Sequence, residues 1–153
     1  MTGIADPWAL LEQTVDANSY MTLATADPSG SPWATPVWFA TRDCLEFFWV
    51  SRPGARHSTN LAARPEIAIS IFDSHQLPGT GRGIYLSAVA RQVLDEELDD
   101  GIGIFSTAAR RAGLSEWVRS DVQAPAQLRL YRAVAVEHFV LSDKDERVPA
   151  LHP

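Results

Sequence analysis

The sequence predicts a mainly β protein with a few helices (an α+β fold) whose strands form a six-stranded antiparallel barrel. Two observations carry this prediction. Six short apolar segments are separated by turn residues along the 153-residue chain, and the helical patterns do not alternate with them one by one. A parallel sheet needs such regular alternation. A closed antiparallel barrel, in contrast, leaves few strand edges exposed.

The first helix is expected at residues 6–16, because Asp6 and Pro7 suit a helix start and Leu11 and Val15 share one face. Helix formers between two prolines predict a second helix at 55–63. A third is expected around 102–109, where apolar residues have helical spacing before Gly113. A short helical piece is also expected around Trp117.

The strands are expected at residues 20–26, 33–41, 45–51, 67–72, 84–94 and 128–141. Residues 27–30, Asp-Pro-Ser-Gly, predict a tight turn between the first two. Residues 73–83 are rich in glycine and polar side chains and predict a loop. The chain is expected to be one domain, 1–153, with a loose, charged C-terminal tail from residue 142.

Composition narrows the possible functions. The chain is 46% apolar and 21% charged, which is typical of a soluble globular domain. A net charge of −6 argues against general binding to nucleic acids. The N-terminus lacks the pattern of a signal peptide, and no apolar run approaches the ~18 residues of a membrane helix, so a cytoplasmic protein without a membrane partner is expected. Cys44 is the single cysteine, which leaves no internal disulfide.

The segment 45–65 contains the best candidate for an anion site. A strand runs into a turn with Gly54 and then into a helix that opens with Arg56, His57 and Ser58. Free backbone N–H groups at a helix start, together with a guanidinium, can bind a phosphate. The alternative from these residues alone is that the two basic side chains are ordinary solvated surface groups.

The order of short motifs resembles the pyridoxamine 5′-phosphate oxidase-like superfamily, the FMN-binding split barrels. The resemblance lies in five successive pieces: Met21-Thr-Leu-Ala-Thr, Gly30-Ser-Pro, Thr35-Pro-Val-Trp-Phe, Phe47-Phe-Trp-Val-Ser, and Gly54-Ala-Arg-His-Ser-Thr-Asn-Leu-Ala-Ala-Arg-Pro. The strand Tyr85-Leu-Ser-Ala-Val-Ala continues it. The resemblance covers about the first two-thirds of the chain and implies a six-stranded antiparallel split β-barrel.

The resemblance also implies roles for individual residues. Arg56 and His57 stand where the family binds the cofactor phosphate, with Ser58 as a helper and Asn60 near the phosphate or ribityl chain. The residues expected to meet or line the place of the flavin ring are Thr35, Pro36, Val37, Trp38, Val50 and Ser51. A lysine is common in the family at the position of His57. No catalytic residue and no metal site is expected.

The function that the resemblance implies is an FMN-dependent oxidoreductase, with hydride transfer to or from a small planar substrate. The family also implies a homodimer with the cofactor at its interface, and Trp38 and Trp49 are expected near that interface. The apolar hairpin strand disfavours pyridoxamine phosphate as the substrate. Two alternatives stay open: a reductase that uses the deazaflavin F420, and a non-enzymatic flavin- or haem-binding protein.

Overall fold

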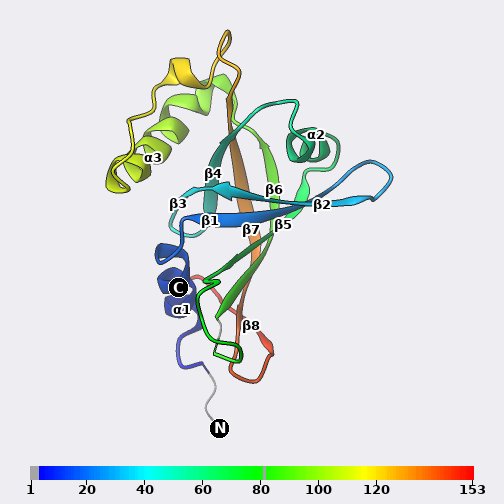
Figure 1. Ribbon diagram of the computed structural model, residues 1–153, viewed down its shortest axis with the longest axis vertical. Coiled ribbons are helices and arrows are strands. Elements are labelled where there is room, and N and C mark those ends of the chain that lie inside the picture. Colours follow the sequence, from blue (N-terminus) through cyan, green and yellow to red (C-terminus); the bar gives the residue numbers. More distant parts are fainter. Residues whose placement is uncertain (1–3, 81) are drawn as a thin grey trace.

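The computed structural model describes residues 4–80 and 82–153 (Figure 1). The strands are β1 (Tyr20–Ala26), β2 (Pro32–Trp38), β3 (Ala40–Arg42), β4 (Glu46–Ser51), β5 (Glu66–Phe72), β6 (Gly83–Gln92), β7 (Arg129–Leu141) and β8 (Arg147–Pro149). The α-helices are α1 (Pro7–Asp16), α2 (Arg56–Ala63) and α3 (Leu98–Arg111), with 3₁₀ turns η1 (Asp95–Glu97) and η2 (Arg119–Asp121). No helix in these two stretches is long and apolar enough to cross a bilayer.

All the strands join one antiparallel sheet that curls into a split barrel. Its order is β2-β1-β5-β6-β7-β4-β3, with β8 on β7. β2 and β3 lie at opposite ends of this order, yet only Phe39 separates them in sequence. Two residue steps span about 7 Å, so the two ends of the sheet must approach each other. Accordingly, β1 and β2 cross the long strands β6 and β7 in Figure 1, and β2 contacts β4.

A tight turn fixes β2 beside β1. The Asp27 carboxylate accepts hydrogen bonds from Ser29 and from the backbone N–H of Ser31, at 2.6–3.0 Å. These bonds lower the pKa of Asp27. Gly30 has a φ of 90°, a backbone conformation that residues other than glycine rarely adopt. The turn therefore sets the register that places Trp33 opposite Thr25.

Two cores hold the fold together. The larger core fills the inside of the curled sheet and includes Leu11, Leu23, Phe47, Trp49, Ile69 and Ile84. The smaller core lies between α3 and the outer side of β3, β4 and β7, and includes Phe48, Ile102, Phe105 and Leu130. In Figure 1, α3 and α2 lie on different sides of β4. β4 therefore separates α2 from the smaller core, which lies on the α3 side.

The acidic segment before α3 belongs to the helix start. α3 begins at Leu98, earlier than the apolar spacing indicates, and Asp99 and Asp100 occupy its first turn, where carboxylates favour the helix dipole. At Gly101 a Cβ atom would lie 2.9 Å from Leu130 Cδ2. Gly101 therefore allows α3 to pack closely on the sheet.

The fold class is confirmed, with differences in detail. The described residues form eight strands where six were expected. The expected strand 33–41 is divided at Phe39, because the chain moves there from one sheet edge to the other. No helical turn surrounds Trp117 itself; the short η2 turn follows it.

The expectation of a loose C-terminal tail is wrong. β8 pairs with the end of β7, and the backbone N–H of Ala150 donates to the carbonyl of His138 at 2.8 Å. Ala150 is buried, and the His152 ring packs edge-on against Trp8 with a centroid distance of 4.8 Å. The tail folds back because its few apolar side chains cover the larger core beside α1.

Candidate cofactor site

The connection from β4 to α2 forms an uncapped helix start. After Ser51, the carbonyl of Arg52 accepts from the N–H of Ala55 at 3.0 Å, which closes a turn. Ala55 is the N-cap and offers no side-chain acceptor, and the first turn of α2 contains no acid. The first N–H groups of the helix are therefore available to an anion from outside the chain.

Arg56 lies at this helix start and is exposed. Its guanidinium carbon lies 4.3 Å from the centre of the Trp33 ring, a cation–π contact between α2 and β2. Arg56 forms no ion pair with any residue that the structure describes. Trp33 is 42% exposed. Together they form the accessible side of the site.

His57 points away from solvent, unlike Arg56. It is buried, and its Nε2 lies 2.7 Å from Ser51 Oγ, a hydrogen-bond distance. Burial lowers the pKa of His57 because it penalises the charged ring. His57 is therefore neutral near pH 7 in this structure. It connects α2 to the end of β4 and does not add a second exposed cation beside Arg56.

Asn60 and Ser58 are also buried, with different surroundings. Asn60 Nδ2 donates to Thr25 Oγ1 at 3.1 Å, and that hydroxyl donates to the carbonyl of Trp33 at 3.4 Å. Asn60 thus anchors α2 to the β1–β2 hairpin. Ser58 is 2% exposed, and its hydroxyl has no partner among the described residues. A buried hydroxyl without a partner is costly unless a ligand or water supplies one.

The expected ring-lining residues lie on β2 and β4, which come together at the split. Pro36 is exposed, Val37 is buried in the larger core, and Thr35 has a buried hydroxyl without a described partner. Trp38 and Val50 are half-buried and pack against the smaller core. The Trp38 ring meets Phe105 edge-on at 5.1 Å.

Trp49, which is expected near a subunit interface, does not lie on the surface of the chain. Trp49 is 0% exposed and stacks on Tyr131 with ring centroids 5.8 Å apart. Trp49 faces into the barrel because side chains alternate along β4, and Phe48 on the other face meets α3 instead.

Sequence reasoning missed Trp33 and Arg52. Trp33 follows the Gly30-Ser-Pro32 turn, and the two-residue period along β2 places it on the same face as Thr35. Arg52 directly follows Ser51, and its Nη1 donates to Gln127 Oε1 at 2.5 Å. The position of Arg52 between the expected site residues Ser51 and Arg56 could have identified it from the sequence.

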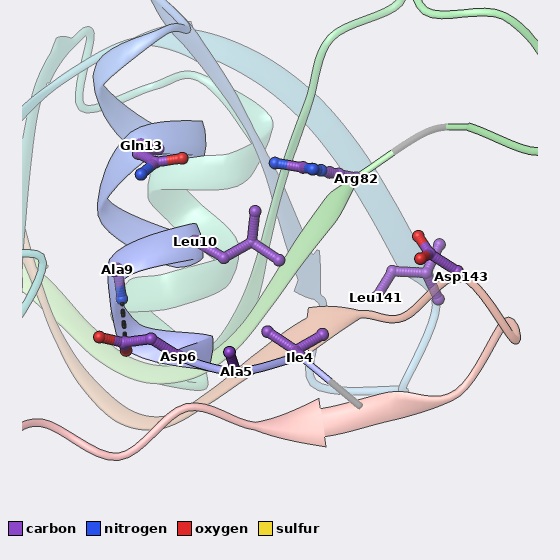
Figure 2. Close-up of a pocket in the computed structure, with 9 residues that line it drawn as sticks. All are labelled: Ile4, Ala5, Asp6, Ala9, Leu10, Gln13, Arg82, Leu141 and Asp143. Atoms are coloured by element: carbon purple, nitrogen blue, oxygen red, sulfur yellow. Dashed lines mark hydrogen bonds between the residues drawn. The ribbon is translucent and has the colours of Figure 1, made fainter. Parts of the chain in front are cut away.

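Three further arginines, Arg129, Arg132 and Arg82, do not form a second basic cluster at the site. Arg129 donates to the carbonyls of Ala126 and Leu128, both at 2.6 Å. Arg132 is ion-paired with Glu46. Arg82 lines a separate hollow of about 350 Å³ beside α1, shown in Figure 2, where its guanidinium points toward that helix.

Neither the cysteine nor a cluster of ligands provides other chemistry. Burial raises the pKa of the Cys44 thiol to about 12, so it is not a thiolate at neutral pH. Within residues 4–80 and 82–153, no group of three or more His, Cys, Asp or Glu side chains could hold a metal ion.

Comparison with known proteins identifies the family of the chain. The family described as pyridoxamine 5′-phosphate oxidase matches residues 9–138, which is most of the chain. The chain therefore belongs to the pyridoxamine 5′-phosphate oxidase family. No curated protein matches the chain significantly.

Several solved structures share the fold. A heme-binding protein from Mycobacterium smegmatis has a TM-score of 0.70 and 18% identity over 96% of this chain, which spans only 59% of that protein. HutZ, a heme storage protein from Vibrio cholerae, has a TM-score of 0.69 and 20% identity, with 88% of this chain and 94% of that chain covered. An F420 reductase has a TM-score of 0.61 and 18% identity, with 86% and 95% covered. Similarity at this level shows the fold alone.

Proposed function

We propose that the chain is an FMN-dependent oxidoreductase that transfers a hydride to or from a small planar substrate. The observation that carries the proposal is the start of α2, where an arginine without an ion pair lies at an uncapped helix start. Both features favour a phosphate. Because the chain as a whole has a net charge of −6, an anion can bind only where positive charge is concentrated locally, as it is here.

The donors around the helix start fit the phosphate of FMN. Arg56 can donate two parallel hydrogen bonds to phosphate oxygens, which lysine cannot do. The N–H groups of α2 add donors, and the buried hydroxyl of Ser58 lacks any other described partner. His57 acts here as a neutral group that holds α2 against Ser51.

The split where β2 meets β4 offers groups that suit a flat ring. β2 ends the strand order, so one side of its backbone has no ladder partner among the described residues. Free N–H and C=O groups on such an edge can bond the polar rim of a ring. Thr35 offers a buried hydroxyl on the inner face of β2. Trp38 and Val50 add half-buried apolar surface on the other face of their strands, beside the smaller core. When bound, FMN supplies the redox chemistry, and these residues bind and orient it.

The outer face of the sheet supports a homodimer. Tyr20, Phe72 and Val136 are 57–65% exposed on this face, and Val89 and Val134, which pair with each other across β6 and β7, are 46% and 40% exposed. A monomer rarely leaves that much apolar surface open. Light scattering is expected to give about twice the chain mass of 16.8 kDa. A monomer that binds the cofactor fully would contradict the dimer.

A matched pair of ligands tests the phosphate site. FMN and riboflavin share the ring and differ by the phosphate. We expect FMN to bind the wild type more tightly, and Arg56→Ala to weaken FMN about 10- to 100-fold while leaving riboflavin unchanged. Arg64→Ala is the control, because Arg64 is the C-cap at the opposite end of α2 and its side chain donates to the carbonyl of Asp27 at 3.3 Å. Equal affinity for FMN and riboflavin would contradict the proposal.

The absorbance spectrum of the freshly purified protein decides between the cofactors. Two near-ultraviolet and visible bands indicate flavin, one violet band the deazaflavin, and a Soret band haem. The deazaflavin is the nearest alternative, since a reductase of that kind shares the fold. Haem is the second, because two haem-binding proteins share it as well.

The reaction is tested by turnover with the reconstituted protein. We expect quinones or enones to be reduced faster than pyridoxamine phosphate is oxidised. The phosphate of pyridoxamine phosphate would need a basic cluster besides the one that binds the FMN phosphate. Arg129 and Arg132 already have partners within the chain, and Arg82 lines a separate hollow. Formation of pyridoxal phosphate without reduction of the planar acceptors would contradict this substrate class.

A further inference from the structure

A hollow of about 750 Å³ lies beside the proposed cofactor site. It lies between the turn after β4 and the segment 114–128 that connects α3 to β7. Arg52 contributes one wall, and Trp117, Leu114 and Leu128 contribute apolar surface. In Figure 1 this segment lies next to the upper ends of β4 and β7.

The hollow adjoins the turn that leads from β4 into α2. Arg52 directly follows Ser51, whose hydroxyl contacts His57 at 2.7 Å. On the other wall, Trp117 meets Phe105 edge-on at 5.5 Å, and Phe105 meets Trp38 at 5.1 Å. Trp117 in the hollow and Trp38 at the split therefore pack against the same buried ring, that of Phe105.

Arg52 supplies the positive charge of the hollow, whose lining also includes the carboxylates of Glu116 and Asp121. Glu116 is paired with Arg110 at 3.4 Å, whereas Asp121 has no described ion pair and accepts from the N–H of Val118 at 2.9 Å. Among the described residues, Arg52 has the neutral amide of Gln127 as its side-chain partner and forms no ion pair. The turn that its carbonyl closes with Ala55 holds its backbone in place.

We propose that this hollow binds the substrate, and that the substrate is a planar aromatic compound with a carboxylate. This inference rests on the proposed oxidoreductase function. One guanidinium matches one carboxylate with two hydrogen bonds, and the Trp117 indole with Leu114 and Leu128 provides flat apolar surface for the ring. A phosphate ester would need more cations than the hollow holds.

Naphthalene-2-carboxylate and naphthalene-2-carboxamide are the probes, because they share the ring and differ in charge. Calorimetric titration of the full chain, with and without FMN, is expected to show about tenfold tighter binding of the carboxylate. Arg52→Gln removes this preference. Arg111→Gln keeps it, since Arg111 is an exposed arginine at the end of α3 that does not line this hollow.

A second variant keeps the test valid if Arg52→Gln does not fold. Gln127→Glu places a carboxylate on the partner of Arg52 and is expected to remove the preference by neutralising the guanidinium. Equal wild-type affinity for the two probes, or a preference that survives in Arg52→Gln, overturns the proposal. If the wild type shows the preference but binds FMN no better than riboflavin, the proposed function fails while this ligand site stands.

Discussion

Two groups of arginines in this protein differ in their partners. On the outer side of β3, β4, β6 and β7, a charged belt joins Arg42, Arg91 and Arg132 to Glu46 and Glu97. Around the β4–α2 turn, Arg52 and Arg56 lie without any described ion pair. Paired arginines hold strands together, whereas unpaired arginines beside a groove remain available to an anionic ligand.

The belt depends on Glu46. This carboxylate contacts both Arg42 and Arg132, and its side chain is only 12% exposed. Burial alone would raise the pKa of Glu46, but the hydrogen bonds from the two guanidinium groups outweigh it and hold the pKa below its ordinary value. Glu46 therefore remains charged while the fold is intact near neutral pH.

Removing Glu46 is expected to have the largest effect on stability. Glu46→Ala leaves the Arg132 side chain, 24% exposed, with only a long contact of 3.7 Å to Glu97. We expect a loss of roughly 2–3 kcal/mol in the free energy of unfolding, between the values for a surface pair and for a buried one. Urea denaturation at pH 7 measures it.

The control for Glu46 is Glu96→Ala, because Glu96 is an exposed glutamate in η1, and its loss is expected to stay within about 0.5 kcal/mol. The stability that Glu46 contributes also depends on pH in a definite direction. A lowered pKa means that the contribution of Glu46 is present above about pH 4.3 and disappears as the pH falls through the folded-state pKa. If Glu46→Ala and Glu96→Ala cost the same, the belt is not structural.

The second prediction concerns the buried contact inside the site. Ser51→Ala removes the hydroxyl that lies 2.7 Å from His57 Nε2 and leaves a buried ring nitrogen without a partner. We expect a loss of about 1–2 kcal/mol. Ser58→Ala is the matched control, because that buried hydroxyl has no described partner to lose, and no loss of stability is expected. Equal losses in thermal or urea unfolding would contradict the assigned contact.

Much of the fold could be predicted from the sequence because the signals were local. The proline-started helix α1, the Asp-Pro-Ser-Gly turn and the alternating strand β1 each depend on neighbouring residues. The division at Phe39 and the pairing of β8 depend on residues far apart in sequence. Short strands in a charged segment give no periodic signal, so the tail was expected to be loose.

Prediction of the site reached the right segment but not the directions of its side chains. The sequence indicates that Arg56 and His57 open a helix, and α2 does begin there. Successive helix residues point about 100° apart, so one of the two faces solvent and the other faces the barrel. Only the three-dimensional packing decides which one is buried, and it also brings Trp33 over Arg56.

The third prediction uses the pH dependence of His57. In the unfolded chain this ring takes up a proton near pH 6.5, whereas burial lowers its pKa in the folded state. As the pH falls below 6.5, the unfolded state therefore binds more protons, and the free energy of unfolding decreases. His57→Gln is expected to flatten this dependence. Identical pH profiles for the wild type and His57→Gln would contradict a buried neutral His57.

The smallest expected effect on stability is that of Arg56→Ala. Its cation–π contact with Trp33 contributes about 0.5–1 kcal/mol at an exposed site. A cation at a helix N-terminus costs a similar amount, about 0.3–1 kcal/mol, through the helix dipole. The two contributions nearly cancel, so the free energy of unfolding is expected to change by less than about 0.5 kcal/mol.

Arg56→Ala is also expected to lose most of the thermal stabilisation that FMN gives. This loss distinguishes the arginines at the β4–α2 turn from those of the charged belt. A ligand that binds the folded state raises the melting temperature according to its affinity. Saturating FMN should stabilise the wild type and Glu46→Ala alike, because Glu46 lies in the belt and not at the start of α2. The same FMN concentration should stabilise Arg56→Ala much less. If Arg56→Ala unfolds several degrees lower without FMN and keeps the full FMN shift, Arg56 belongs with the structural arginines, and the division between the two groups is wrong.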